Sequence, residues 1–137
     1  MVIKRFTLKT KGDCDIINIT DKISDILKGV GFDSGIVNVF VVGSTAGLSV
    51  IEYEPNLERD FKDFFNRIIP KDIKYYHHET WNDDNGHSHI RASLLKPDIT
   101  VPYEKGKMIL GQWQQIILVD FDTGSRDREV IVSVIEG

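Results

Sequence analysis

All four histidines of this chain lie within residues 77–89, in the stretch HHETWNDDNGHSH. The same stretch carries carboxylates and an amide, from Glu79, Asp83, Asp84 and Asn85. Imidazole groups bind transition metals and transfer protons near neutral pH, and carboxylates assist in both roles. The clustering therefore indicates a metal or catalytic site, whereas the alternative is a solvated surface loop that is rich in histidine.

His87 and His89 are two positions apart, after Gly86. If this segment is extended, alternation places both imidazoles on the same face, where they can share a metal ion. One histidine of the pair at residues 77–78 would complete a set of three imidazoles, which together with water is the pattern of a catalytic zinc site. Further ligands, or side chains that orient the ligands, would come from the nearby carboxylates Glu79, Asp83 and Asp84 and from Glu52. Without a metal, the same imidazoles are candidates for acid, base or phosphate-binding roles.

Two other segments have residues suited to binding an anion. VGSTAG, residues 42–47, contains Ser44 and Thr45 between two predicted strands, and its small residues expose backbone N–H groups. It lacks the P-loop pattern, and an ordinary tight turn is the alternative. Arg126 and Arg128 present planar guanidinium groups that suit phosphate or carboxylate, although an exposed charged run is equally consistent with their spacing.

Trp113 and the single cysteine, Cys14, are interpreted as packing residues. GQWQQI, residues 111–116, places Trp113 at the start of a strand, where a buried indole would anchor the core. Gln114 lies on the opposite face and can meet polar surroundings. Cys14 has acidic neighbours that disfavour a thiolate, so it is expected to be a packed strand residue and a poor nucleophile.

Composition limits the classes of function. The chain has 137 residues, which fits one domain over 1–137, and 17 basic and 21 acidic residues give a net charge of -4. An acidic protein has no general attraction for nucleic acid or anionic membranes. No signal peptide or membrane-length apolar run is present in the sequence, so we expect a cytoplasmic protein without nucleic-acid or membrane partners.

Apolar periodicity predicts the elements that position these residues. Strands are expected at 2–10, 14–19, 35–43, 48–54, 98–104, 107–110, 114–121 and 128–136, with 35–43 buried on both faces. One helix follows Thr20 as its N-cap and ends at Gly29 or Gly31, and a second is capped by Asn56 and stops at Pro70. Residues 89–96 can form a short helix. The pattern favours an α+β fold with a mostly antiparallel or mixed sheet and two main helices.

Four segments together resemble the YjbQ family: VNVFVVGSTAGLSVIEYEP, NDDNGHSHIRASLL, ITVPYEKGKMILGQWQQIILVDFD and SRDREVIVSVIEG. The resemblance extends from about residue 4 to the end of the chain. It implies an α+β fold, assembly as a homotrimer with sites near subunit boundaries, and a thiamin-phosphate-synthase activity. That reaction joins a pyrimidine diphosphate to a thiazole phosphate and releases pyrophosphate.

The residues that match the family's motifs are His78, Asp84, Asn85, His89, Trp113, Gln114, Arg126 and Arg128. The chain also departs from the family pattern, because Gly43 stands where most members carry histidine and His87 stands where many carry proline. Tyr53 and Glu54 replace the usual Glu-Asn pair. We hypothesise that His87 supplies the imidazole that is missing at position 43.

These observations lead to an expected enzyme whose histidines, His78, His87 and His89, hold a divalent metal, most simply zinc. Glu52, Asp84, Asn85 and His89 are the expected catalytic residues, and Ser44, Thr45, Arg91, Gln114, Arg126 and Arg128 are expected to bind a phosphorylated small molecule. The alternatives are a non-catalytic trimer that binds a metal or small ligand, and a structural trimer whose polar loop borders the interface.

Overall fold

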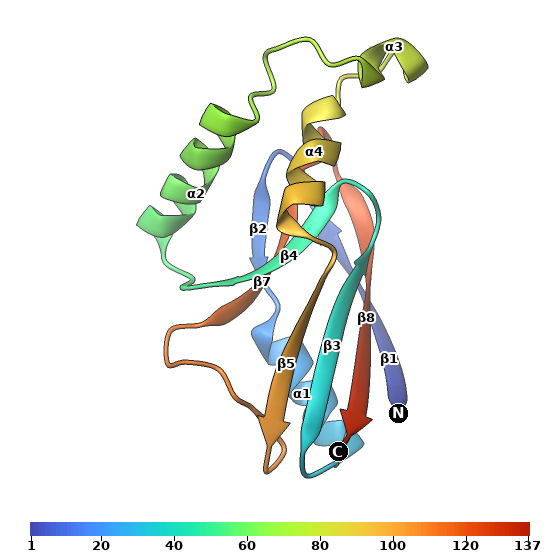
Figure 1. Cartoon of the computed structure of the whole chain (residues 1–137), viewed down its shortest axis with the longest axis vertical. Helices are drawn as coiled ribbons and strands as arrows, with labels where there is room; N and C mark the ends of the chain where they lie inside the picture. Colours follow the sequence, from blue (N-terminus) through green and yellow to red (C-terminus); the bar gives the residue numbers. More distant parts are fainter.

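The protein is described by a computed structural model that covers residues 1–137. Eight strands and four helices follow one another along the chain (Figure 1). Their bounds are β1 (Val2–Thr10), β2 (Asp15–Asn18), α1 (Thr20–Val30), β3 (Gly35–Val42), β4 (Ala46–Ile51), α2 (Pro55–Ile68), α3 (His77–Trp81), α4 (Gly86–Leu95), β5 (Asp98–Glu104), β6 (Lys107–Met108), β7 (Gln115–Asp120) and β8 (Arg126–Glu136).

The strands form two antiparallel sheets, which confirms the expected α+β fold. The larger sheet has the order β1-β8-β3-β5-β6 and the smaller one has the order β2-β7-β4. One apolar cluster fills the space between the two sheets and α1, and a second lies between the small sheet, α2 and α4. The residues of β7 therefore contact a core on both faces, and Ile116, Ile117, Leu118 and Val119 are fully buried.

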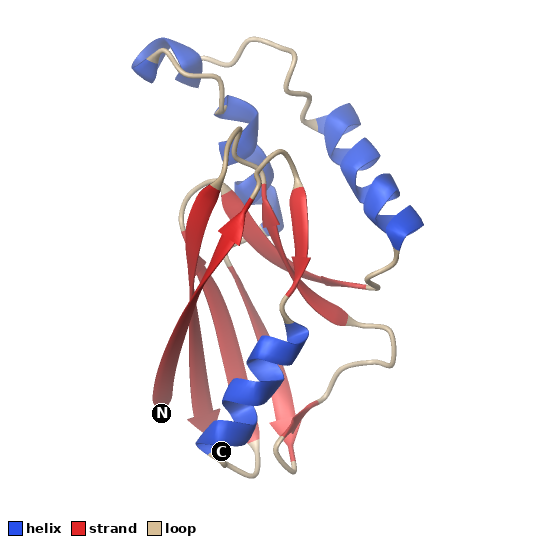
Figure 2. Cartoon of the chain, turned by 180° about the vertical axis from the view of Figure 1, so that it is seen from behind, coloured by secondary structure: helices blue, strands red, loops and turns tan.

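The expectation that residues 35–43 are buried on both faces is wrong. In β3 the side chains of Val37, Val39 and Val41 are fully buried, whereas Ile36, Phe40 and Val42 are each about 40% exposed. Alternation along a strand sends these two sets to opposite sides. Figure 2 shows α1 crossing the inner side of the large sheet, while no helix lies in front of β3 and β8 in Figure 1.

Both predicted helix caps lie one or two residues from the observed ones. Thr20 is the first residue of α1, and its hydroxyl accepts from the Ile116 N–H at 2.8 Å, which ties the helix to β7. At α2 the cap is Glu54, whose carboxylate accepts from the N–H groups of Asn56 and Leu57. Of the two glycines expected to end α1, Gly31 does so, in a left-handed conformation.

The histidine-rich stretch, residues 77–89, lies at the end of the molecule where α4 begins, which is the upper end in Figure 1. The β1–β2 turn, the β3–β4 turn and the β7–β8 turn all reach this end. Because every strand neighbour is antiparallel, short turns at one end bring distant parts of the chain together. None of the four helices is both long and apolar enough to cross a membrane.

Candidate functional site

The histidine-rich stretch is helical rather than extended at its C-terminal end. α4 begins at Gly86, so His87 and His89 both lie in its first turn. A helix turns by about 100° per residue, so side chains two positions apart point in nearly opposite directions. The expectation that His87 and His89 share a face is therefore wrong. His87 is only 3% exposed and packs beside Tyr75, whereas His89 is half-buried and lines a cavity at the β3–β4 turn.

His78 has a structural contact of its own. Its Nε2 accepts a hydrogen bond from the Gly86 N–H at 3.0 Å, and its ring packs against Tyr75 with a centroid distance of 5.5 Å. The first N–H groups of a helix have no partner within the helix, so this imidazole acts as a cap for α4. The lone pair that a metal would need is used by this hydrogen bond.

The three histidines expected to hold zinc do not fit that role, because His78 caps α4 and His87 and His89 point to different cavities. No group of three or more His, Cys, Asp or Glu side chains is arranged to hold a metal ion. The fourth histidine, His77, packs edge-on against His89 with ring centroids 4.5 Å apart, and its Nε2 lies 3.7 Å from an Asp83 oxygen. The observed partner of His89 is thus another imidazole.

The cavity beside His89 has a volume of about 300 Å³ and lies between the β3–β4 turn and α4. Its lining residues include Gly43, Ser44, Ala46, His89, Ala92 and Ser93. The backbone N–H groups of Gly43, Ser44 and Thr45 donate to no acceptor within the chain. Successive free N–H groups in a turn favour the binding of an anion.

A buried ion pair supports this turn from behind. Arg128 binds Asp120 through two hydrogen bonds, from Nε to Oδ2 at 2.7 Å and from Nη2 to Oδ1 at 2.9 Å. Nη2 also donates to Thr45 Oγ1 at 2.6 Å. The remaining nitrogen, Nη1, makes no hydrogen bond within the chain and lies against Gly43, where a Cβ would be only 2.5 Å away. Glycine at position 43, with φ of +137°, therefore admits the guanidinium.

Asp122 joins this ion pair to the N-terminal end of α4. Its carboxylate accepts from Thr45 Oγ1 at 2.9 Å and from Arg126 Nε at 3.0 Å. Burial acts to raise the pKa of Asp122, but the hydrogen bonds from Thr123 N–H and Thr45 and the charge of Arg126 outweigh it and lower the pKa. Asp122 is therefore ionised at neutral pH.

The Asn85 amide lies between two carboxylates. One terminal atom is 3.5 Å from Asp122 Oδ1, and the other is 3.2 Å from Asp83 Oδ1. Only the NH2 end can donate, so the amide binds one of these carboxylates at a time. Asn85 thus lies beside Asp122, whereas Asp84 lines a separate cavity together with His87.

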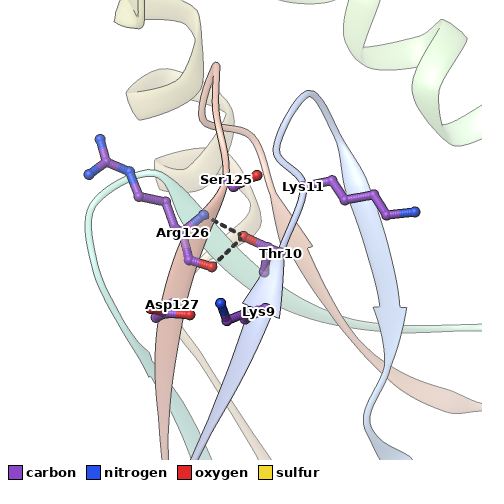
Figure 3. A pocket seen from close by; sticks show the side chains of 6 residues that line it. All are labelled: Lys9, Thr10, Lys11, Ser125, Arg126 and Asp127. Atoms are coloured by element: carbon purple, nitrogen blue, oxygen red, sulfur yellow. Dashed lines mark hydrogen bonds between the residues drawn. The ribbon is translucent and has the colours of Figure 1, made fainter.

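A surface hollow at the ends of β1 and β8 has basic residues but no convergent groups. Figure 3 shows its six lining residues, Lys9, Thr10, Lys11, Ser125, Arg126 and Asp127. The side chains of Lys11 and Arg126 point to opposite sides in this view, and Thr10 Oγ1 is bonded to the backbone of Arg126. The hollow follows from a strand pairing rather than from a built binding site.

Glu52 and Gln114 lie at the other end of the small sheet. β4 enters it at Ala46, opposite Asp120, and leaves at Ile51, opposite Gln115. At roughly 3.3 Å per residue the two ends are about 17 Å apart, so Glu52 and Gln114 are not brought to the cavity. Gln114 Oε1 instead accepts from the Gly111 N–H at 2.7 Å and closes a local turn.

Two other interpretations are corrected by packing. Trp113 was expected in the core, but it is 65% exposed because it lies in the turn before β7 rather than in the strand. Arg91 was expected to bind substrate, but it is buried and donates to Ile69 O at 2.9 Å and to Asn66 Oδ1 at 3.1 Å. Its guanidinium therefore holds α4 against the end of α2.

His87 does not replace the imidazole missing at position 43, because His87 and Gly43 line different cavities. Sequence reasoning also missed Thr10, Asp120 and Asp122, which build the ion-pair network with Arg128. The sequence IILVDFD contains a usable signal: Asp120 and Asp122 stand two positions apart at the end of an apolar strand, shortly before two arginines. Charged residues at such a strand end require partners when they are buried.

Comparison with known proteins identifies relatives over almost the full length. A family model for the UPF0047 protein YjbQ-like group matches residues 4–137. A UPF0047 protein of Methanothermobacter thermautotrophicus is 38% identical over 127 residues, which cover 93% of this chain and 87% of the relative. A UPF0047 protein of Archaeoglobus fulgidus is 36% identical over 129 residues, which cover 94% of this chain and 98% of the relative.

Solved structures agree with the fold. A YbjQ-like protein of Sulfolobus solfataricus superposes with a TM-score of 0.92 at 27% identity, covering 99% of this chain and 97% of that one. A yjbq/upf0047 family protein of Clostridium acetobutylicum has a TM-score of 0.88 at 34% identity, and the match covers 96% of this chain and 99% of that one. The arrangement of sheets and helices is thus that of these relatives.

Proposed function

Because this chain belongs to the YjbQ-like UPF0047 family, we propose that it binds a phosphorylated small molecule at the β3–β4 turn and carries out a thiamin-phosphate-synthase-like transfer. The observation that carries the proposal is a set of free donors around one turn. The N–H groups of Gly43, Ser44 and Thr45 and the Nη1 of Arg128 have no acceptor within the chain. Unpaired donors of this kind favour an anionic ligand.

The orientation of the Arg128 guanidinium supports a phosphate or diphosphate. Arg128 is held by Asp120 and Thr45, so its guanidinium is already oriented and binding a phosphate does not require it to be ordered. A guanidinium presents N–H groups in a plane that matches phosphate oxygens. Asp122 pairs with Arg126 and Asp120 pairs with Arg128, so the site offers a phosphate oriented N–H donors rather than net positive charge.

In the proposed reaction the bond between the pyrimidine methylene carbon and the diphosphate oxygen breaks. The thiazole nitrogen forms the new bond to that carbon, and the diphosphate leaves with the bonding electron pair. Negative charge therefore grows on the leaving group, and donors fixed before the reaction stabilise it most effectively. In this proposal His89, which lines the same cavity, donates to a phosphate oxygen. The histidines do not gather around one point, so no step is assigned to a metal held by them.

The proposal is tested by incubating the purified protein with the pyrimidine diphosphate and the thiazole phosphate and measuring thiamin phosphate by chromatography. His89→Gln and Ser44→Pro, which removes the N–H of residue 44, should each lower the rate by roughly 100-fold, as loss of a transition-state donor does. Gln114→Ala is the matched control, since Gln114 lies at the far end of the small sheet. Equal rates in all four proteins would exclude this cavity as the site.

A second candidate is a binding protein without turnover. The observation in its favour is that the His89 ring has no hydrogen-bond partner to orient it, whereas a general base is usually held by a third group. This candidate predicts that titration with inorganic diphosphate gives binding that His89→Gln weakens, while no thiamin phosphate forms. Product formation that depends on His89 would instead favour the enzyme.

We also propose that the chain assembles as a homotrimer through the outer face of the large sheet. Apolar side chains on this face, Ile3, Ile36, Phe40, Val42 and Ile135, are each 37–48% exposed. Contiguous exposed apolar groups favour a protein contact. Light scattering after gel filtration should give three times the chain mass, and Phe40→Asp should shift the protein to smaller species. A trimer that survives Phe40→Asp would place the contact elsewhere.

A further inference from the structure

A second cavity lies on the other side of α4 from the β3–β4 turn. It has a volume of about 370 Å³ and is lined by Asp13, Lys71, Asp72, Asp84, His87 and Thr123. These residues come from the β1–β2 turn, the segments on either side of α3, the first turn of α4 and the β7–β8 turn. The cavity is thus built from five parts of the chain that meet at one end of the fold.

His87 is the buried part of this cavity wall. Its side chain is 97% buried, and Nδ1 is the one buried side-chain nitrogen or oxygen in the chain that has no hydrogen-bond partner. Leaving a buried polar atom without a partner costs about 1–3 kcal/mol, so an unpaired nitrogen on a ring that lines a cavity indicates a missing partner.

The neighbours of His87 determine what this nitrogen offers. The Ser88 hydroxyl donates its proton to Phe121 O, so towards the His87 Nε2, 3.4 Å away, it can only accept. The proton of the neutral imidazole therefore belongs on Nε2, and Nδ1 carries a lone pair. Burial, followed by the charges of Arg91 and Lys71, lowers the pKa of His87, which keeps the ring neutral. A ligand must therefore bring a hydrogen-bond donor to Nδ1.

The rim of the cavity supplies negative charge. Three carboxylates face one ammonium, and the Lys71 ammonium is already paired with Asp13 at 3.4 Å. Asp72 and Asp84 are exposed and have no ion-pair partner within the chain. The unpaired charge of the lining side chains is negative, so the rim of the cavity favours a cation over an anion, whereas the charges of Arg91 and Lys71 act in the opposite sense at the His87 ring. Because no three donors are arranged to hold a metal ion, an ammonium group fits better than a metal.

We propose that this cavity binds a small organic molecule through a protonated amino group, which donates to His87 Nδ1 while Asp72 and Asp84 balance its charge. The site is separate from the cavity assigned to the phosphorylated ligand, because it uses His87 rather than His89. It is therefore tested independently of the transfer reaction. The ligand class is a primary amine or diamine of a size that suits the cavity.

The test is calorimetric titration of the whole protein with 1,4-diaminobutane and n-butylamine at constant ionic strength. Tetramethylammonium carries the same charge as n-butylamine without an N–H, and 1-butanol carries no charge. We expect the two amines to bind and both comparison compounds to bind at least 10-fold more weakly. The amines should also shift the ¹⁵N resonance of His87 Nδ1, since a new donor changes the shielding of that nitrogen.

Variants identify the residues responsible. His87→Phe keeps a ring but removes the lone pair, and it should weaken amine binding about 10-fold. Asp84→Asn, at the exposed rim, should weaken amine binding about 3-fold. Asp63→Asn removes an exposed carboxylate of α2 outside the cavity and should have no effect. If His87→Phe does not fold, Asp84→Asn together with the ¹⁵N shift still decides the question.

Three results would overturn the proposal. The first is an absence of amine binding at ~10 mM, a concentration well above the Kd of a specific site. The second is equal weakening by Asp63→Asn and Asp84→Asn, which would indicate general charge attraction. The third is tight zinc binding that His87→Phe abolishes while amines do not compete, because the cavity would then be a metal site.

Discussion

Replacement of Arg128 by Met should destabilise the fold strongly. The substitution leaves the Asp120 carboxylate, which is fully buried, without the two N–H donors that balance its charge. Breaking a buried ion pair by removing one partner costs about 3–5 kcal/mol. Asp120 keeps hydrogen bonds from Thr10 Oγ1 and from the Asp122 N–H, so the lower end, roughly 3 kcal/mol, applies. For a chain of this length that corresponds to a fall in Tm of about 10 °C.

The assay is the free energy of unfolding from urea titration, with every variant at the same protein concentration so that any self-association affects all of them alike. The double variant Arg128→Met with Asp120→Asn carries no unpaired charge and should recover more than half of the loss. The matched control is Lys74→Met, which removes an exposed ion pair to Glu79 of 3.1 Å. Exposed pairs contribute little, so we expect a change of about 0.5 kcal/mol or less.

Two outcomes would refute this reasoning. If Arg128→Met and Lys74→Met lower the free energy of unfolding equally, burial does not decide the strength of the Arg128–Asp120 pair. If the double variant is no more stable than Arg128→Met, the loss comes from packing of the long side chain rather than from the stranded carboxylate.

Three further predictions concern single positions. Gly43→Ala should lower the free energy of unfolding by about 1–3 kcal/mol, measured by urea titration, because φ is positive there and the new Cβ meets Arg128 Nη1. Cys14 has a pKa raised to about 11, mainly by burial, so mass spectrometry should find it unmodified by iodoacetamide at neutral pH in the folded protein and modified in urea. Folding lowers the pKa of His87 from 6.5, so below that pH the unfolded chain binds more protons than the folded chain and the free energy of unfolding falls. His87→Phe lacks this group, so its Tm relative to that of wild type should rise as the pH is lowered from about 8 to about 5. A difference in Tm that stays constant over this range would contradict the prediction.

Local patterns in the sequence predict most of the elements correctly. Alternation and β-branched residues identify β1, β5 and β8 almost to the residue, and the apolar spacing from Ile23 to Val30 identifies α1. These signals are local, because side chains within one strand or helix turn reveal which face is buried. The same local chemistry singles out the small residues of the 43–46 turn and the arginines before the last strand.

The site depends on contacts that no local pattern contains. Whether His87 and His89 share a face was decided by the start of α4 at Gly86, and that start is fixed by His78 from another segment. Asp120 and Arg128 belong together because a tight turn brings β8 back beside Thr45. Sequence alone therefore determined the family, the fold class and the residue types available for chemistry. Only tertiary structure decided which of them meet, because helix direction and burial set where each side chain points.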